Sequence, residues 1–254
     1  MIYDLQKASL LKRFSAFLLD IILLVILITG FAWMLSSMLG FSETSEQLDA
    51  VITKYEKQFG INFSITNDDY DKLTDEQKKH FEDSYNVVIN DEEYIILTNK
   101  IFYSLITIVS ISFLLSFVVL EFIVPLIFKN GQTIGKKIFS IAVMRVDGVK
   151  ATPIFIFVRG ILGKYTIETM IPTIILLMMR FGVGSIVTLA VVVLIGLFEL
   201  ILLITTKTNS FIHDIISSTV VVDLQSQMIF ESVEAKEEYR LRIHKEEAQN
   251  AKYF

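Results

Sequence analysis

The chain has 254 residues, 53% of them hydrophobic, and few soluble globular chains reach its mean hydropathy of +0.57. It contains no cysteine, which excludes disulfide bonds, thiolate catalysis and cysteine-ligated zinc. Only three histidines are present, which disfavours a histidine metal centre, and we expect neither a metal nor a cofactor.

Three apolar blocks exceed the roughly 20 residues that a helix needs to cross about 30 Å of hydrocarbon. They are residues 14–39, 101–128 and 183–206. The first block is too long for a cleavable signal peptide, and no small-residue cleavage site closes it. The sequence therefore predicts at least three membrane crossings.

A fourth apolar block, 153–179, is long enough to cross but carries three charged residues, Arg159, Lys164 and Glu168. It is either a full crossing, or an interfacial helix at 153–165 followed by a short crossing at 166–180. Lys164 and Glu168 stand four residues apart, so on an α-helix we expect them to neutralise one another.

Basic residues fill the segment before the first block, the connection between the second and third helices, and the position after the last block. They are Lys7, Lys12, Arg13, Lys129, Lys136, Lys137, Arg145, Lys150 and Lys207. Four crossings place all of them on one side, as the positive-inside rule requires, whereas three crossings would put the C-terminal tail outside. We therefore predict an all-α polytopic membrane protein with four transmembrane helices and both termini in the cytosol.

The segment 42–99 then forms one extracellular insert. It holds 14 acidic and 5 basic side chains, a net charge of −9, whereas the rest of the chain has 14 acidic and 18 basic, a net charge of +4. Its pattern predicts a helix that ends at Gly60 and a second one opened by a Thr74–Gln77 capping box. We expect residues 85–90 to be extended and Asp91 to cap the next long helix.

Between the second and third helices, the fragment "GQTIGKK" departs from a phosphate-binding loop in length and lacks a Ser or Thr after the lysine, so we expect no nucleotide there. The fragment "IAVMRVDGVKAT" predicts a cytosolic β-hairpin, because Asp-Gly favours a tight turn between extended arms. The fragment "TVVVD", near residue 220, is expected to run as an edge strand beside this hairpin. The tail beyond residue 229 predicts a solvated, charge-rich helix.

Four ionisable residues lie at one depth of the predicted bundle. With a rise of 1.5 Å per residue, Asp20 lies about 10 Å beyond Arg13, Glu121 and Glu199 each lie about 12 Å from the interface, and Arg159 lies about 9 Å in. Because a charge at mid-membrane costs on the order of 3 kcal/mol, we expect these groups to face the bundle interior. Asp20 is expected to accept a hydrogen bond from Arg159 or His213. Three acids against one arginine predict an acidic surplus.

Four motifs together resemble one known family. They are "KRFSAFLLDIILL", "NGQTIGKKIFSIAVMRVDG", "VRG" and "FIHDIISSTVVVD", and they resemble, in this order and over residues 10–222, the RDD family of membrane proteins. The family is named after one arginine and two aspartates, which by the match of motifs are Arg13, Asp20 and Asp214, with His213 beside the last. Asp214 is expected to pair with Arg13 or Lys12.

The resemblance implies a small polytopic protein, mostly bacterial, whose family has no established common activity. Some members have been linked to sodium/proton exchange and others to assembling or regulating membrane complexes. This chain departs from the common form through its external insert and its charged tail, and both additions favour partner binding.

Two functions follow. The first is a proton-coupled cation or small-solute transporter, with Asp20, Glu121 and Glu199 as carriers and Arg159 as counter-charge. The second is a non-catalytic membrane subunit that binds a partner through residues 43–95, and the same buried charges then serve as structural pairs. We expect no enzyme and no nucleic-acid binding, because no nucleophile–base pair is evident and the basic residues follow the membrane face.

We accordingly expect a multi-pass protein of the bacterial plasma membrane, with the lipid bilayer as its surroundings. The predicted segments are 1–41 (first transmembrane helix), 42–99 (insert), 100–128 (second helix), 129–152 (amphipathic segment and hairpin), 153–206 (third and fourth helices), 207–228 (His-Asp latch) and 229–254 (tail helix).

Overall fold

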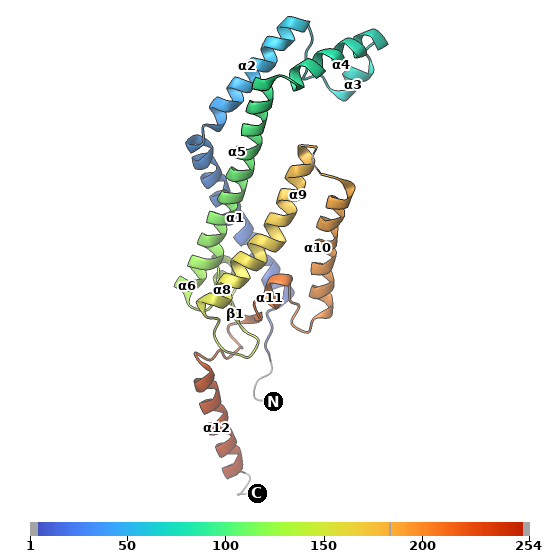
Figure 1. Ribbon diagram of the computed structural model, residues 1–254. Helices are drawn as coiled ribbons and strands as arrows, with labels where there is room; N and C mark the ends of the chain where they lie inside the picture. Colours follow the sequence, from blue (N-terminus) through green and yellow to red (C-terminus); the bar gives the residue numbers. More distant parts are fainter. Residues whose placement is uncertain (1–4, 183, 251–254) are drawn as a thin grey trace. The chain divides into compact units, whose positions relative to one another are not determined.

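The computed structural model describes residues 5–182 and 184–250, which are mostly helical. They form two compact units. Unit 2 is Gly30–Ile111, and unit 1 comprises the described residues on either side of it. Figure 1 shows the order of the elements.

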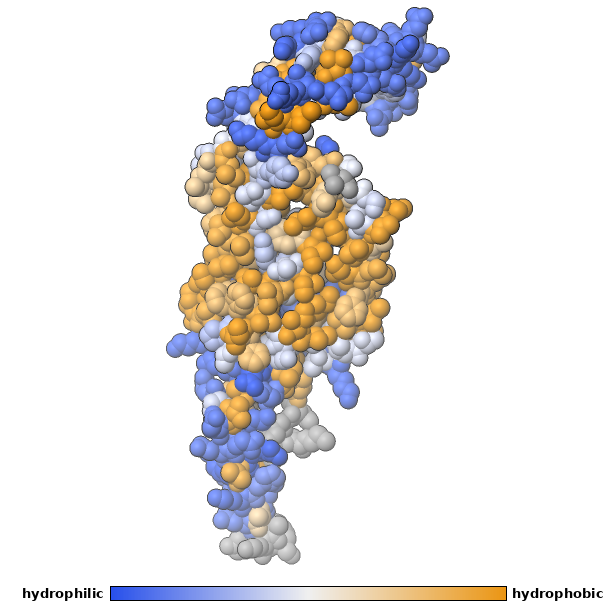
Figure 2. Space-filling model, viewed as in Figure 1, coloured by the Kyte–Doolittle hydropathy of each residue, from blue (hydrophilic) through white to orange (hydrophobic). Residues whose placement is uncertain are grey.

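The described residues contain four helices that are long and apolar enough to cross a membrane: Leu10–Met38, Glu92–Phe128, Pro153–Arg180 and Ile186–Thr205. The first is α1 and the last is α10. The second begins at Glu92, directly after the predicted cap Asp91 and before the predicted crossing at residue 100. The third is a single helix of α-helical and π-helical turns, long enough for a full crossing. In Figure 2 the surface over these helices is mainly hydrophobic, whereas α12 (Val233–Asn250) is hydrophilic.

The two inner apolar helices are each interrupted by π-helical turns. One runs through α5 (Glu92–Phe117), η1 (Val118–Ile123) and α6 (Val124–Phe128). The other runs through α8 (Pro153–Phe157), η2 (Val158–Met170) and α9 (Ile171–Arg180). A π-turn closes five residues back rather than four, so it is wider than an α-turn and shifts which residues share a face.

A small antiparallel sheet joins two distant parts of unit 1. β1 (Ile141–Arg145) pairs with β2 (Thr219–Asp223), and Ile141 lies opposite Asp223. The predicted strand at 219–223 therefore lies beside the first arm of the predicted hairpin, but the second arm of that hairpin forms no strand. The Asp147-Gly148 turn is present, but residues after it give only an isolated bridge, Met144 to Lys150. The stretch between the turn and Pro153, where α8 begins, is too short to form a strand, whereas Thr219, Val220, Val221 and Val222 of β2 are all β-branched.

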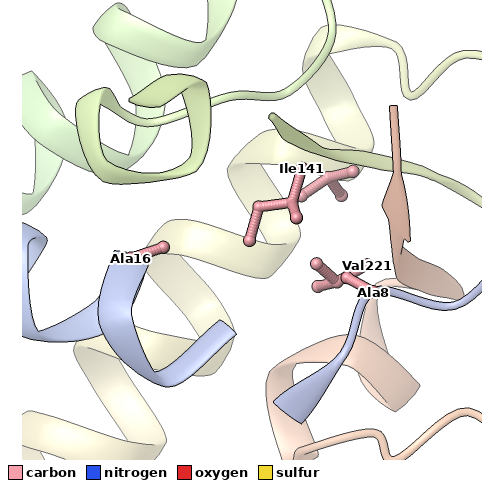
Figure 3. Packing of buried hydrophobic residues seen from close by; sticks show 5 residues of the cluster. Ala8, Ala16, Ile141 and Val221 are labelled. Atoms are coloured by element: carbon pink, nitrogen blue, oxygen red, sulfur yellow. The ribbon is translucent and has the colours of Figure 1, made fainter. Parts of the chain in front are cut away.

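The sheet is buried on both faces. One face packs with α1 in a cluster of Ala8, Ala16, Ile141, Val143 and Val221 (Figure 3). The other face is a cluster of Ala142, Met144, Val220 and Val222. Successive strand residues point to opposite faces, which is why these two short apolar runs supply both clusters. Ala16, 1% exposed, contributes the small side chain of α1 to the first cluster.

Unit 1 also contains two short helices beside the sheet, α7 (Ile134–Ile138) and α11 (Ile212–Ile216). α7 follows α6 and leads into β1, while α11 follows α10 and leads into β2. Each strand is therefore preceded by a short helix, and because β1 and β2 pair antiparallel, α7 and α11 lead into the sheet from opposite ends.

Unit 2 contains α2 (Phe41–Phe59), α3 (Asn67–Asp71) and α4 (Asp75–Ile89). Gly60 ends α2 in the left-handed conformation (φ 67°), and the Thr74–Gln77 capping box opens α4. Asp91 caps α5 by accepting from the Tyr94 backbone N–H at 2.9 Å. The predicted extended stretch 85–90 is wrong, because α4 continues to Ile89 and buries Ser84 and Val88 at helical spacing.

A close approach between two inner helices gives a testable prediction. A Cβ at Gly160 in η2 would lie 2.8 Å from the backbone oxygen of Glu121, whereas a Cβ at Gly196 in α10 would meet nothing within 4 Å. Gly160→Ala should therefore lower the stability of detergent-solubilised protein by about 1–3 kcal/mol through overpacking. Gly196→Ala, the matched control, should be neutral or slightly stabilising in the same thermal-unfolding assay. Equal melting temperatures for the two variants would contradict this packing.

Candidate functional site

The centre of the site is the carboxylate of Asp214, which is fully buried in α11. Its Oδ1 pairs with Arg159 Nη1, and its Oδ2 lies 3.3 Å from Arg13 Nη2. The backbone N–H of Phe211 also donates to Oδ2, at 3.1 Å. Burial alone would raise the pKa of Asp214, but the positive charges of Arg159 and Arg13 outweigh it and hold that pKa well below its usual range. Asp214 is therefore a permanent anion between two guanidinium groups.

Arg13 connects this anion to the loop that follows α10. Its Nη1 donates to the backbone oxygen of Asn209 at 2.5 Å and to that of Thr208 at 3.3 Å. Its guanidinium lies over the ring of Phe211, 5.4 Å from the centroid, a cation–π distance. Arg13 thus fixes the start of α1 against the entry to α11.

The contacts of His213 define its tautomer. Arg159 Nη2, which can only donate, lies 3.1 Å from Nε2, so Nε2 accepts. Nδ1 then carries the proton and donates to Glu168 at 2.8 Å. Burial lowers the pKa of His213, and the positive charge of Arg159 acts in the same direction, while Asp214 and Glu168 oppose it. A neutral imidazole therefore links the arginine to the second carboxylate.

The π-helical geometry of η2 makes this arrangement possible. Arg159 and Glu168 are nine residues apart, about two and a half turns of an α-helix, which would place them on opposite sides. In the wider turns of η2 both side chains reach α11, where Arg159 binds Asp214 and Glu168 binds His213. Gly163, between them, lies so close to α11 that a Cβ there would be 2.5 Å from the Cβ of His213.

A second group of charges lies around Glu121 in η1. Lys164 of η2 donates to Oε1, and the Lys136 Nζ lies 3.8 Å from Oε2. Lys136 is 7% exposed and also donates to the hydroxyl of Thr133 at 3.2 Å. Burial lowers the pKa of Lys136 to about 8, although Glu121 acts to raise it. Glu121 thus has two cations within reach.

Asp20 is bound by the start of α7. Its Oδ2 accepts from the Thr133 hydroxyl at 2.5 Å, and its Oδ1 accepts from the Gly135 backbone N–H at 2.8 Å. A Cβ at Gly135 would lie 2.2 Å from the backbone oxygen of Ala16, so only glycine permits this approach of α7 to α1. A carboxylate is favoured here because the first N–H groups of a helix lack intrahelical acceptors.

Glu199 of α10 is the least satisfied member. Its Oε2 accepts from the Ile212 backbone N–H at 3.3 Å. Its Oε1 is buried and has no hydrogen-bond partner among the residues that the structure describes. Glu199 therefore differs from the other carboxylates of the site, which are bound on both oxygens.

The predicted charge layer is only partly a single cluster. The predicted hydrogen bond from Arg159 or His213 to Asp20 is wrong. Asp20 accepts from Thr133 and Gly135 at the start of α7, and Arg159 pairs with Asp214. The predicted Lys164–Glu168 pair is also wrong, since the two side chains bind Glu121 and His213 instead. The pair of Arg13 with Asp214 is present, while Lys12 binds Asp223 at 2.5 Å.

Sequence reasoning missed four members of the site: Thr133, Lys136, Lys164 and Glu168. The predicted acidic surplus falls to one, since the site holds four cations, Arg13, Lys136, Arg159 and Lys164, against five carboxylates, Asp20, Glu121, Glu168, Glu199 and Asp214. One signal was available in the sequence. Arg159 and Glu168 stand nine residues apart, which puts them on opposite sides of an α-helix but on nearly the same side of the wider π-helix.

The apolar helices, tied together at one end by a small sheet and buried ion pairs, are those of a multi-pass membrane protein. The sequence model of the RDD family matches residues 7–218, and the chain belongs to the RDD family. This confirms the resemblance seen in the motifs, and the match contains every charged residue of the site. A search of curated proteins and a search of solved structures each found no match.

Removing the central anion tests the network. Asp214→Asn leaves the Arg13 and Arg159 guanidinium groups buried without a counter-charge, so it should destabilise the protein by about 3–5 kcal/mol. Asp223→Asn removes a carboxylate whose partner Lys12 is 37% exposed, and it should cost less than about 1 kcal/mol. Thermal unfolding in detergent measures both. Similar small losses would show that Asp214 is not the central anion.

The buried histidine predicts a pH dependence. Because the pKa of His213 is lowered in the folded state, the unfolded chain binds more protons, and stability is lost as the pH falls below the unfolded value of about 6.5. Between about pH 7.5 and about pH 5.5 the melting temperature should fall less in His213→Gln than in the unmodified protein. His244→Gln is the control, since that ring is on the exposed tail helix. A pH profile identical for all three proteins would contradict the prediction.

Proposed function

We propose that this protein is a non-catalytic membrane subunit that assembles or regulates a partner complex. The observation that carries the proposal is the pairing of the family's charges. Arg13, Asp20 and Asp214 are all bound by groups of the same chain. Charges so fully satisfied hold helices in one arrangement, whereas a carrier has to exchange its partners.

Unit 2 supports a partner of basic character. The insert 42–99 has a net charge of −9, from 14 acidic and 5 basic side chains. Its helix α4 also exposes two large side chains, Tyr85 (43%) and Val87 (50%), among these acids. Exposed aromatic and apolar groups within a strongly charged surface suit a protein partner of opposite charge.

The topology that fits this role has both termini in the cytosol and the insert 42–99 outside. The basic residues near the ends of the apolar helices support it, because cytosolic loops carry an excess of Lys and Arg. In a bacterium this membrane is the plasma membrane, and the partner surface then faces outward. We propose no enzymatic activity, since the charged groups of the site are mostly paired with one another.

Proton-coupled cation transport is the second candidate, and one observation favours it. Glu199 lies in an otherwise apolar helix, and its buried Oε1 has no partner among the described residues. A buried carboxyl oxygen without a protein partner can accept a transported ion, whereas the oxygens of the other carboxylates of the site are already bound. Glu199, rather than Asp20 or Glu121, is then the carrier.

Mild-detergent extraction of the full chain tests the first proposal. A stoichiometric partner should co-purify, and Glu76→Lys/Asp83→Lys on α4 should release it by reversing charge on the proposed surface. Glu246→Lys/Glu247→Lys on α12 makes the same charge change elsewhere and should leave the complex intact. Tm values of both variants should match that of the unmodified protein, because all four side chains are exposed.

The opposite outcome is equally specific. The protein would purify without a partner, and after reconstitution into liposomes a sodium gradient would drive proton flux. If Glu199→Gln abolishes that flux while the protein stays folded, the transport function replaces the assembly function.

A further inference from the structure

A cavity of about 320 Å³ lies between the sheet and the tail helix α12, both in unit 1. It belongs to neither the charge network nor unit 2. The turn after β1, the stretch 227–230 and the first turns of α12 form its walls. The lining residues are Leu5, Met144, Val146, Asp147, Gly148, Gln227, Met228, Phe230, Lys236 and Arg240.

The polar wall of this cavity is positively charged. Lys236 and Arg240 stand four residues apart, on one face of α12. Lys236 Nζ donates one of its three N–H groups to the backbone oxygen of Asp147, at 2.6 Å, and keeps two for another acceptor. The Asp147 carboxylate is itself paired with Arg145, at 2.5 Å, and Arg240 Nη1 lies 3.4 Å from the half-exposed carboxylate of Glu237 on the same helix.

The opposite wall is apolar and continues toward the membrane. Met144 and Leu5 line the interior, while Val146 and Met228 are 62% and 50% exposed at the rim. The turn at 146–148 precedes Pro153, where an apolar helix long enough to cross begins. Ile154, in the first turn of that helix, is 61% exposed. Val146 and the start of this helix are linked through Ser218, whose backbone oxygen accepts from the Val146 N–H at 3.1 Å and which lines a second cavity together with Ile154.

We propose that this cavity binds an anionic phospholipid, with Lys236 and Arg240 holding the headgroup phosphate and Val146 and Met228 contacting the start of the acyl chains. Two adjacent cations favour a phosphate group, and Arg can bind it through two parallel hydrogen bonds. The volume is in the range of small-molecule sites, of about 300–1,000 Å³, and so exceeds the need of a free phosphate ion. The lipid would fix the tail helix against the sheet.

Lipid binding to the full chain tests the proposal. The purified protein is placed in nanodiscs of phosphatidylcholine alone or with phosphatidylglycerol, and bound lipid is counted by native mass spectrometry after release. Phosphatidylglycerol should be retained preferentially. Lys236→Gln/Arg240→Gln should weaken its retention by about tenfold or more, since each basic side chain near an anionic surface contributes about fivefold.

The matched control is Arg242→Gln/Lys245→Gln, which removes the same charge from the same helix outside the cavity lining. It should keep the retention of the unmodified protein. Equal losses in both variants would show a diffuse electrostatic effect and overturn the site. Displacement of the lipid by millimolar inorganic phosphate would also overturn it, because the occupant would then be a free anion.

Discussion

The ion pairing of Asp214 is the interaction on which unit 1 depends. One carboxylate receives Arg13 from α1, Arg159 from η2 and the N–H of Phe211 from its own helix. Three segments that are far apart in the chain therefore meet at one anion. A buried charge of this kind is costly unless all its partners are present, so it selects one arrangement of the helices rather than adding much to stability.

The π-helical turns and the glycines are the means by which the helices come close enough for these pairs. η2 presents Arg159 and Glu168 to the same short helix, which α-helical turns would not do. Gly135 lets α7 approach α1, and Gly163 lets η2 approach α11, because a Cβ at either position would overlap an atom of the neighbouring helix. Close backbone contact at the glycines and ion pairing between the buried charges therefore depend on each other.

Much of the fold could be predicted from the sequence, because membrane helices and caps are local signals. The apolar blocks, the Gly60 stop, the Thr74 capping box and the 219–223 strand all follow from composition and spacing. The predicted edge strand at 219–223 does pair with β1, whereas the lack of a second strand in the predicted hairpin could not be foreseen, since an Asp-Gly turn does not fix how far its arms pair. The partners of Lys164 and Glu168 could not be predicted, because a period of 3.6 residues assigns their faces wrongly within η2. Those of Asp20 could not either, because they lie more than a hundred residues further along the chain, at the start of α7.

The distance in sequence between Arg13 and Asp214, 201 residues, has a consequence for biosynthesis. At about 5–20 residues per second, the arginine waits about 10–40 s on the ribosome before its carboxylate exists. During that time it is a cation without its carboxylate near the start of the first helix, while α1 can already be held to α7 through Asp20. The last membrane helix must be inserted before Arg13 finds its counter-charge, so a truncated chain would carry an unneutralised arginine.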